Sequence, residues 1–145
     1  MNSTSPASRD TPDISTPFGT RHILCIDDVP EVLLLLRDVL CEAGYRVTAW
    51  TSADEDLNAV SALAPDLIVV DYLWGHGKDS WAFLQWLKLD HRTRHIPAIL
   101  LSGALHLLGE RRDTLRRMGI VMIRKPFDLD GLVRTIETML ATDGA

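Results

Sequence analysis

Four short runs of apolar residues, each followed by polar or charged groups, constrain the fold of this chain more than any other feature. The runs lie at 23–26, 67–70, 96–101 and 120–123. Continuous apolar runs of this length are typical of strands buried on both faces, as in a parallel sheet. The groups that follow them are Asp27 and Asp28, Asp71, Ser102, and Lys125. We therefore predict parallel strands whose ends carry the chemistry.

A fifth strand and five helices complete a regular alternation. Residues 46–51 alternate between apolar and polar side chains, which indicates a strand with one face less covered. Helical patterns lie at about 30–43, 53–63, 80–89 and 107–118, and a last helix begins at Asp128 as its N-cap. Strand–helix units in this order predict an α/β fold with helices on both faces of the sheet.

The first residues have a different composition from the rest of the chain. Residues 1–20 are rich in Ser, Thr and Pro and contain few large apolar side chains. Such a segment buries too little surface to offset the entropy of ordering it. We interpret 1–20 as a disordered tail and 21–145 as a single domain, a size that suits one hydrophobic core.

Charge and hydropathy exclude several classes of partner. The chain carries 15 Lys and Arg against 20 Asp and Glu, for a net charge of −5. Direct nucleic-acid binding requires clustered positive charge, so we do not expect it. No apolar run approaches the roughly 20 residues that a membrane helix needs. We therefore expect a cytoplasmic protein without a membrane partner.

The five histidines show no metal-ligand spacing, and we interpret all of them as surface or loop residues.

The acidic residues after the strands predict a metal site. The carboxyl ends of parallel strands gather at one edge of the sheet. Asp27, Asp28 and Asp71 would meet there, and three carboxylates in contact repel one another unless a cation balances them. Mg²⁺ prefers oxygen ligands of this kind. The pattern therefore predicts Mg²⁺ bound by these three acids.

The same strand ends supply the groups that phosphoryl transfer requires. This reaction needs an in-line nucleophile and positive or hydrogen-bonding groups around the phosphoryl oxygens. Asp71 is our candidate nucleophile and phosphoacceptor, and attack by its carboxylate would form an acyl phosphate. Ser102 and Lys125 are our candidates for holding phosphoryl oxygens.

These residues, together with the sequence Lys125, Pro126, Phe127, resemble the response-regulator receiver family of two-component signal transduction. The resemblance extends from about Arg21 to Ala141. It implies a flavodoxin-like (βα)5 fold, a three-layer sandwich with the parallel sheet in the order 2-1-3-4-5. It also implies that a histidine kinase or histidine phosphotransfer protein phosphorylates Asp71.

The resemblance assigns finer roles within the site. Asp28 and Asp71 would bind Mg²⁺ directly with the backbone carbonyl of Leu73, and Asp27 would act through a water. Ser102 would move toward the phosphoryl group. Lys125 would form an ion pair with that group and precede a cis proline.

No output domain is expected after Ala141, since four residues remain. The expected output is therefore a change in contacts with a downstream protein that the sequence does not identify. A phosphorylation-dependent homodimer would use the face formed by the helix at 107–118, the strand at 120–123 and the last helix.

Three positions depart from the family pattern. Gly75 stands where many receivers carry a proline, and Asp79 with Ser80 replaces an Asp-Gly pair. Met122 stands where receivers carry an aromatic residue, so we expect the segment 103–109 rather than Met122 to report the state of the site.

Several alternatives remain open at this stage. A Mg²⁺-dependent phosphatase of the haloacid dehalogenase type also uses an Asp nucleophile, but that Asp lies on its first strand. A degenerate receiver would act only as an interaction module. The leading interpretation is a phosphorylation-dependent switch, and we do not expect an enzyme. Asp28 could simply cap a helix, and Asp71 could be a solvated loop acid.

The arginines at 111, 112, 116 and 117 form either a solvated helix face or a docking surface for an acidic partner.

Overall fold

A single parallel sheet forms the centre of the computed structural model, which describes residues 20–52, 57–73, 78–103 and 108–143. The strands are β1 (His22–Ile26), β2 (Arg46–Trp50), β3 (Leu67–Asp71), β4 (Ala98–Ser102) and β5 (Val121–Arg124). They lie in the order β2-β1-β3-β4-β5, and every neighbouring pair is parallel. The predicted sheet order is confirmed.

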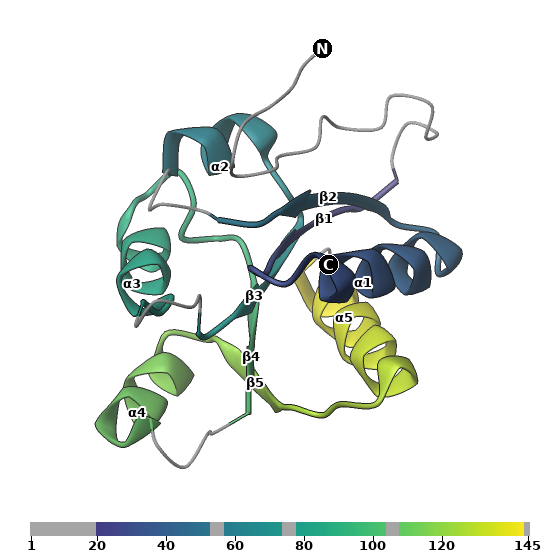
Figure 1. The fold of residues 1–145 in the computed structure, drawn as a ribbon. Helices are drawn as coiled ribbons and strands as arrows, with labels where there is room; N and C mark the ends of the chain where they lie inside the picture. The colour runs from purple at the N-terminus through teal and green to yellow at the C-terminus, as the bar shows by residue number, and fades with distance from the viewer. Residues whose placement is uncertain (1–19, 53–56, 74–77, 104–107, 144–145) are drawn as a thin grey trace.

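Helices cover both faces of this sheet. They are α1 (Pro30–Glu42), α2 (Leu57–Leu63), α3 (Trp81–Leu89), α4 (Glu110–Arg117) and α5 (Leu129–Asp143). Figure 1 shows α1 and α5 on one face, and α2, α3 and α4 on the other. The structure therefore has the three layers that the sequence predicts. No helix within the described ranges is long and apolar enough to cross a membrane.

Two apolar clusters fill the spaces between the layers. Successive side chains of a strand point to opposite faces of the sheet. In β1 this places Ile23 and Cys25 in the cluster that faces α1 and α5, and Leu24 and Ile26 in the other cluster. All five residues of β1 are buried, as a central strand with helices on both faces requires.

Local signals in the sequence mark where the helices begin and end. Pro30 occupies the first turn of α1, where its missing N–H costs nothing. Gly44, with φ of 100°, follows the end of α1, and Gly119, with φ of 81°, follows α4. The predicted N-cap of the last helix is confirmed, because the Gly131 N–H donates to Asp128 Oδ2 at 3.1 Å.

The prediction for the two edge strands was wrong in one respect. We expected the alternating strand at 46–51 to have one less covered face, but residues 47–50 of β2 are all buried. The continuous apolar run at β5 is instead only partly buried. Both apolar clusters extend to β2, one on each face of the strand, since Val47 belongs to one cluster and Trp50 to the other. Exposure at a sheet edge depends on which helices reach it, which local periodicity does not record.

His22 also departs from its prediction as a surface or loop residue. It lies on β1 with an exposed fraction of 3%. Its Nε2 lies 2.6 Å from Thr48 Oγ1 on β2, and its backbone N–H donates to Asp66 Oδ2 at 2.7 Å. Burial lowers the pKa of the imidazole, and the nearby charge of Arg46 acts in the same direction. His22 is therefore held neutral in the folded protein.

We expect the His22→Gln variant to lose less stability than the wild-type protein as pH falls below about 6.5, which is the ordinary pKa of histidine. Below that pH the unfolded chain binds a proton that folded His22 resists, so the free energy of unfolding falls. Gln keeps a hydrogen-bonding group near Thr48 without titrating. Urea unfolding at pH 7.5, 6.5 and 5.5 measures the difference, with exposed His91→Gln as control. Equal pH slopes for wild type and His22→Gln would contradict this account.

Candidate functional site

Three carboxylates meet where β1 and β3 end. Asp71 is the last residue of β3, and Asp27 directly follows β1. The register of these parallel strands pairs Ile26 with Val70 and so brings the two acids side by side. One carboxylate oxygen from each of Asp27, Asp28 and Asp71 lies within 4.8 Å of the others. The structure thus brings together the acids that the sequence placed at these ends.

Lys125 reaches the three carboxylates from the end of β5, an edge strand of the sheet. It directly follows β5, and its Nζ lies 2.5 Å from Asp71 Oδ1 and 3.7 Å from Asp27 Oδ2. Its backbone N–H donates to the carbonyl of Ser102 at 2.9 Å, which ties the end of β5 to the end of β4. The peptide bond between Lys125 and Pro126 is cis. The ammonium group therefore neutralises part of the acidic charge.

Ser102 and Leu73 occupy the remaining predicted positions. Ser102 is the last residue of β4, which lies between β3 and β5 in the sheet, and it is 3% exposed. Leu73 follows Asp71 by two residues, and its side chain is 59% exposed. Serine and leucine thus flank the acids, one buried within the sheet and one at the surface.

Two of the simpler interpretations do not fit the geometry. The N-cap of α1 is Val29 and not Asp28, and no side chain caps it by a hydrogen bond. The Val29 N–H instead donates to Asp27 Oδ1 at 2.9 Å, while Asp28 is exposed. Asp71 is 7% exposed, so it is not a solvated loop acid.

Burial makes the ionised form of Asp27 unfavourable in this position. The pKa of Asp27 is raised to about 6, mainly by loss of solvent contact and also by the charge of Asp71, against the hydrogen bond from the Val29 N–H and the charge of Lys125. The pKa of Asp71 is also raised by burial, against the hydrogen bond and charge of Lys125. Burial lowers the pKa of Lys125, but its contacts with Asp71 and Asp27 raise it overall. Lys125 therefore stays charged beside acids that are costly to ionise.

The acidic group fits a divalent cation. Asp27 Oδ2 is buried and has no hydrogen-bond partner among the described residues. The Lys125 ammonium lies 3.7 Å from this oxygen, too far for a hydrogen bond, and a buried carboxylate oxygen without a close partner is costly. With three carboxylates and one ammonium group, the cluster keeps an excess of negative charge. Oxygen ligands with this balance suit Mg²⁺.

The sequence analysis missed a group of residues directly beside this site. Arg111 on α4 contacts Tyr72, Asp79 and Trp81, which lie between β3 and the first turn of α3. From the sequence, Arg111 is one of four arginines interpreted as a solvated helix face or a docking surface. The position of Tyr72 directly after Asp71 was visible in the sequence, but its partner comes from a distant helix and carries no local signal.

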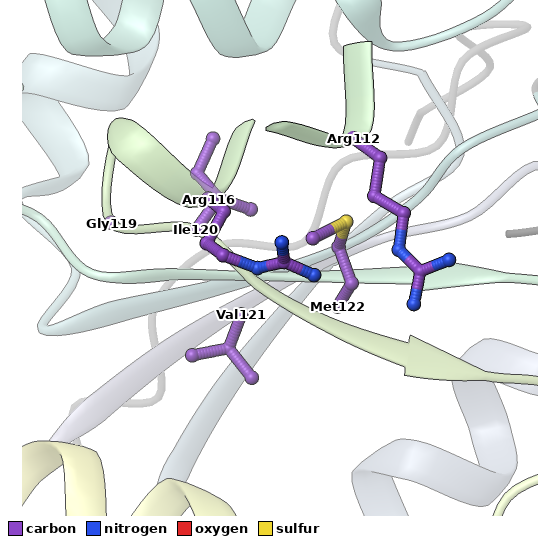
Figure 2. Close-up of a pocket in the computed structure, with 6 residues that line it drawn as sticks. All are labelled: Arg112, Arg116, Gly119, Ile120, Val121 and Met122. Atoms are coloured by element: carbon purple, nitrogen blue, oxygen red, sulfur yellow. The ribbon is translucent and has the colours of Figure 1, made fainter. Parts of the chain in front are cut away.

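A hollow of about 350 Å³ lies between α4 and β5, away from the acids. Its lining residues are Arg112, Arg116, Gly119, Ile120, Val121 and Met122. Figure 2 shows the Met122 side chain directed toward the arginines of α4 and the Val121 side chain directed to the other face. The hollow lies at the beginning of β5, whereas Lys125 follows its end. It is therefore a surface feature separate from the acidic site.

Comparison with known proteins identifies relatives for this arrangement. Residues 23–137 match the response regulator receiver domain. The chain is 31% identical over 121 residues to the nitrogen assimilation regulatory protein NtrX of Azorhizobium caulinodans, covering 83% of this chain and 26% of that protein. It is 28% identical to the polar-differentiation response regulator DivK of Brucella ovis, covering 83% of this chain and 97% of that protein. The chain thus spans about a quarter of NtrX but nearly all of DivK.

Solved structures agree with these matches. The receiver domain of NtrX from Brucella abortus superposes with a TM-score of 0.70 at 30% identity, covering 83% of this chain and 98% of that one. The chemotaxis protein CheY4 of Vibrio cholerae has the same fold, with a TM-score of 0.68 at 20% identity over 83% of this chain and 98% of that one.

We expect Asp27→Asn to stabilise the chelator-treated protein at neutral pH. The folded pKa of about 6 lies above the ordinary 3.8, so wild-type stability falls as pH rises between these values. Asn keeps an oxygen for the Val29 N–H and removes the titration. The gain should exceed about 1 kcal/mol at pH 7.5, since one pKa unit corresponds to about 1.4 kcal/mol.

Urea unfolding in EDTA at pH 4.5 and 7.5 measures this gain. The exposed acid variant Asp113→Asn serves as control, and it should change stability little at either pH. A wild-type protein as stable as Asp27→Asn at pH 7.5 would show that the buried carboxylate carries no such cost.

Proposed function

The chain belongs to the response regulator receiver family, and on that basis we propose that it accepts a phosphoryl group on Asp71 and switches protein contacts in a two-component system. Receiver domains are phosphorylated by histidine kinases or phosphotransfer proteins. The observation that carries the proposal is the convergence of Asp71 with Asp27, Asp28 and Lys125 at adjoining strand ends.

The chemistry follows from the groups at these ends. A carboxylate oxygen of Asp71 attacks the phosphorus of a phosphohistidine, so that an O–P bond forms and the N–P bond of the donor breaks. The donor imidazole leaves with the electron pair of that bond. Lys125, already paired with Asp71 Oδ1, then has a phosphoryl oxygen as a further partner. The hydroxyl of Ser102 is the proposed hydrogen-bond donor to a second oxygen.

Mg²⁺ is the proposed cofactor. Asp28, Asp71 and the backbone carbonyl of Leu73 would bind it directly, and Asp27 would bind it through water. When bound, the ion would neutralise charge on the carboxylates and on the phosphoryl oxygens. The Oδ2 of Asp27 supports this assignment, because it is buried and has no hydrogen-bond partner among the described residues, with only the Lys125 ammonium at 3.7 Å beside it.

The proposed role is that of a switch without an enzymatic activity of its own. Receiver domains are generally signalling modules, and the family match leaves the haloacid dehalogenase alternative without support. We propose 21–145 as the working unit and 1–20 as a tail. The downstream partner is an unidentified protein. The face of α4, β5 and α5, which includes the hollow and its two arginines, is the proposed surface for that partner or for a phosphorylation-dependent homodimer.

Incubation with acetyl phosphate and MgCl₂ is expected to add one phosphoryl group to the wild-type protein by intact mass. Asp71→Asn should abolish the gain, because an amide cannot attack phosphorus as a carboxylate does. Omission of Mg²⁺ should have the same effect. Asp113→Asn, which removes an exposed carboxylate on α4, is the matched control and should be modified at the wild-type rate.

Two outcomes would overturn the assignment. Asp71→Asn that gains the same mass at the same rate would place the acceptor elsewhere. A wild-type protein that gains no mass from acetyl phosphate and also fails to bind beryllofluoride with Mg²⁺ would be a degenerate receiver.

Self-dephosphorylation is expected to be slow and to become faster in Leu73→Asn. By resemblance this position flanks the path of the attacking water, and an apolar side chain there cannot orient water by a hydrogen bond. One such bond made in the transition state accelerates decay about tenfold. The decay of the phosphorylated form after removal of donor measures the rate. Leu89→Asn, an exposed leucine on α3, should leave it unchanged, and an equal rate in Leu73→Asn would refute the mechanism.

A further inference from the structure

One arginine on α4 holds three residues that lie close after Asp71 in the chain. Arg111 Nη1 donates to Tyr72 Oη at 2.6 Å and to Asp79 Oδ2 at 3.1 Å. The guanidinium group lies over the ring of Trp81, 4.6 Å from its centroid. We call Arg111, Tyr72, Asp79 and Trp81 the Arg111 clamp.

The clamp holds both ends of the connection between β3 and α3. Tyr72 directly follows Asp71, and its carbonyl accepts from the Ser80 N–H at 2.8 Å. Leu73 pairs with Asp79 through an isolated antiparallel bridge. Asp79 Oδ1 accepts from the Trp81 N–H at 3.0 Å, which joins the bridge to the first residue of α3. A displacement at either end of the connection therefore changes the distances to Arg111.

Within the described residues, α4 has little else to fix its position. Every residue of Glu110–Arg117 except Thr114 and Leu115 is charged, and Leu115 is the buried side chain of the helix. A short helix with so small an apolar face gains little from packing. Tyr72, by contrast, is 8% exposed and belongs to the apolar cluster beneath α4. The hydrogen bond from Arg111 therefore ties a weakly anchored helix to a firmly packed ring.

We propose that the Arg111 clamp couples metal and phosphoryl occupancy at Asp71 to the position of α4, with Arg111 as a positioning residue for the segment that carries Leu73. The inference rests on the proposed function, which assigns the Leu73 carbonyl to Mg²⁺. Coupling between two sites is reciprocal. An ion that holds Leu73 in position therefore also holds α4, and loss of Arg111 lowers the affinity for the ion. Without the clamp, ion binding alone has to hold Leu73 in position, which costs affinity.

The clamp offers a route that does not depend on Met122. Met122 packs against the apolar cluster and lines the hollow, and its thioether is at most a weak acceptor. The segment 103–109, which the sequence led us to expect as the reporter, lies partly outside the described residues. Arg111 is the second residue of α4, and it contacts Tyr72, the residue next to Asp71. It therefore joins α4 directly to the end of β3.

The test is a titration of the full, isotope-labelled chain with MgCl₂, in which amide NMR chemical shifts are monitored at each concentration. In the wild-type protein, shifts at 67–73 should report the affinity, and shifts at 110–117 should follow with the same midpoint. Arg111→Ala should raise the Kd about fivefold, at the lower end of allosteric couplings, and should abolish the shifts at 110–117. Tyr72→Phe removes only the hydroxyl and should act in the same direction.

Arg112→Ala is the matched control, since it removes the same charge from the neighbouring position of α4. It should keep the Kd within about twofold and keep the shifts of α4. Arg111→Lys retains a cation over Trp81 and one donor group, so it should restore part of the affinity. A purely structural role would lower the unfolding midpoint of Arg111→Ala and leave the Kd unchanged.

The outcomes separate this inference from the proposed function. If the wild-type protein titrates and Arg111→Ala behaves like Arg112→Ala, the inference is overturned and the function stands. Tighter Mg²⁺ binding in Arg111→Ala also overturns it, since the clamp would then oppose binding. If amides at 67–73 in the wild-type protein ignore MgCl₂, the proposed function fails and the inference falls with it.

Discussion

The pairing of Lys125 with the buried carboxylates of Asp71 and Asp27 is the interaction on which the strand-end site depends. Burial raises the pKa of both acids, and the charge of a neighbouring carboxylate adds to this cost, Asp71 acting on Asp27 and Asp28 acting on Asp71. The lysine that offsets the cost arrives from β5, two strands away from β3 in the sheet. The charge balance of the site therefore depends on the position of β5 in the sheet, close enough to β3 for Lys125 to reach Asp71.

That balance is incomplete, and the remaining negative charge is what a bound cation would neutralise. One ammonium group faces three carboxylates, and an oxygen of Asp27 is left buried without a hydrogen bond among the described residues. A site that were fully neutral would gain nothing from a cation. An excess of negative charge at the strand ends favours a small divalent ion, and under the proposed function that ion would also offset the charge of an anionic phosphoryl group.

The opposite charge gathers on α4, at the other side of the β3–α3 connection. The helix is rich in arginine, and its residues serve different neighbours: Arg111 faces Tyr72 and Asp79, while Arg112 and Arg116 line the hollow above β5. One face of α4 thus contacts residues that follow Asp71 in the chain, and the next face lines the hollow. An element that is weakly packed and connected to both sides is suited to change position when the site is occupied.

The sequence by itself determined the sheet, its order by resemblance, the ends of several helices and the convergence of Asp27, Asp28, Asp71, Ser102 and Lys125. These features follow from apolar periodicity, from Pro and Gly at helix ends, and from the rule that parallel strands end at one edge. Each signal is local in the chain, or depends only on the direction of the strands.

Only the tertiary structure decided the burial of His22, the coverage of β2 and β5, and the partners of Arg111. Asp79 and Arg111 are 32 residues apart, and an arginine among other charged residues carries no mark of the tyrosine it will meet. Such contacts depend on how far each helix extends over the sheet and which side chains then lie opposite one another. That is a property of packing between distant segments, and it is determined when the layers come together.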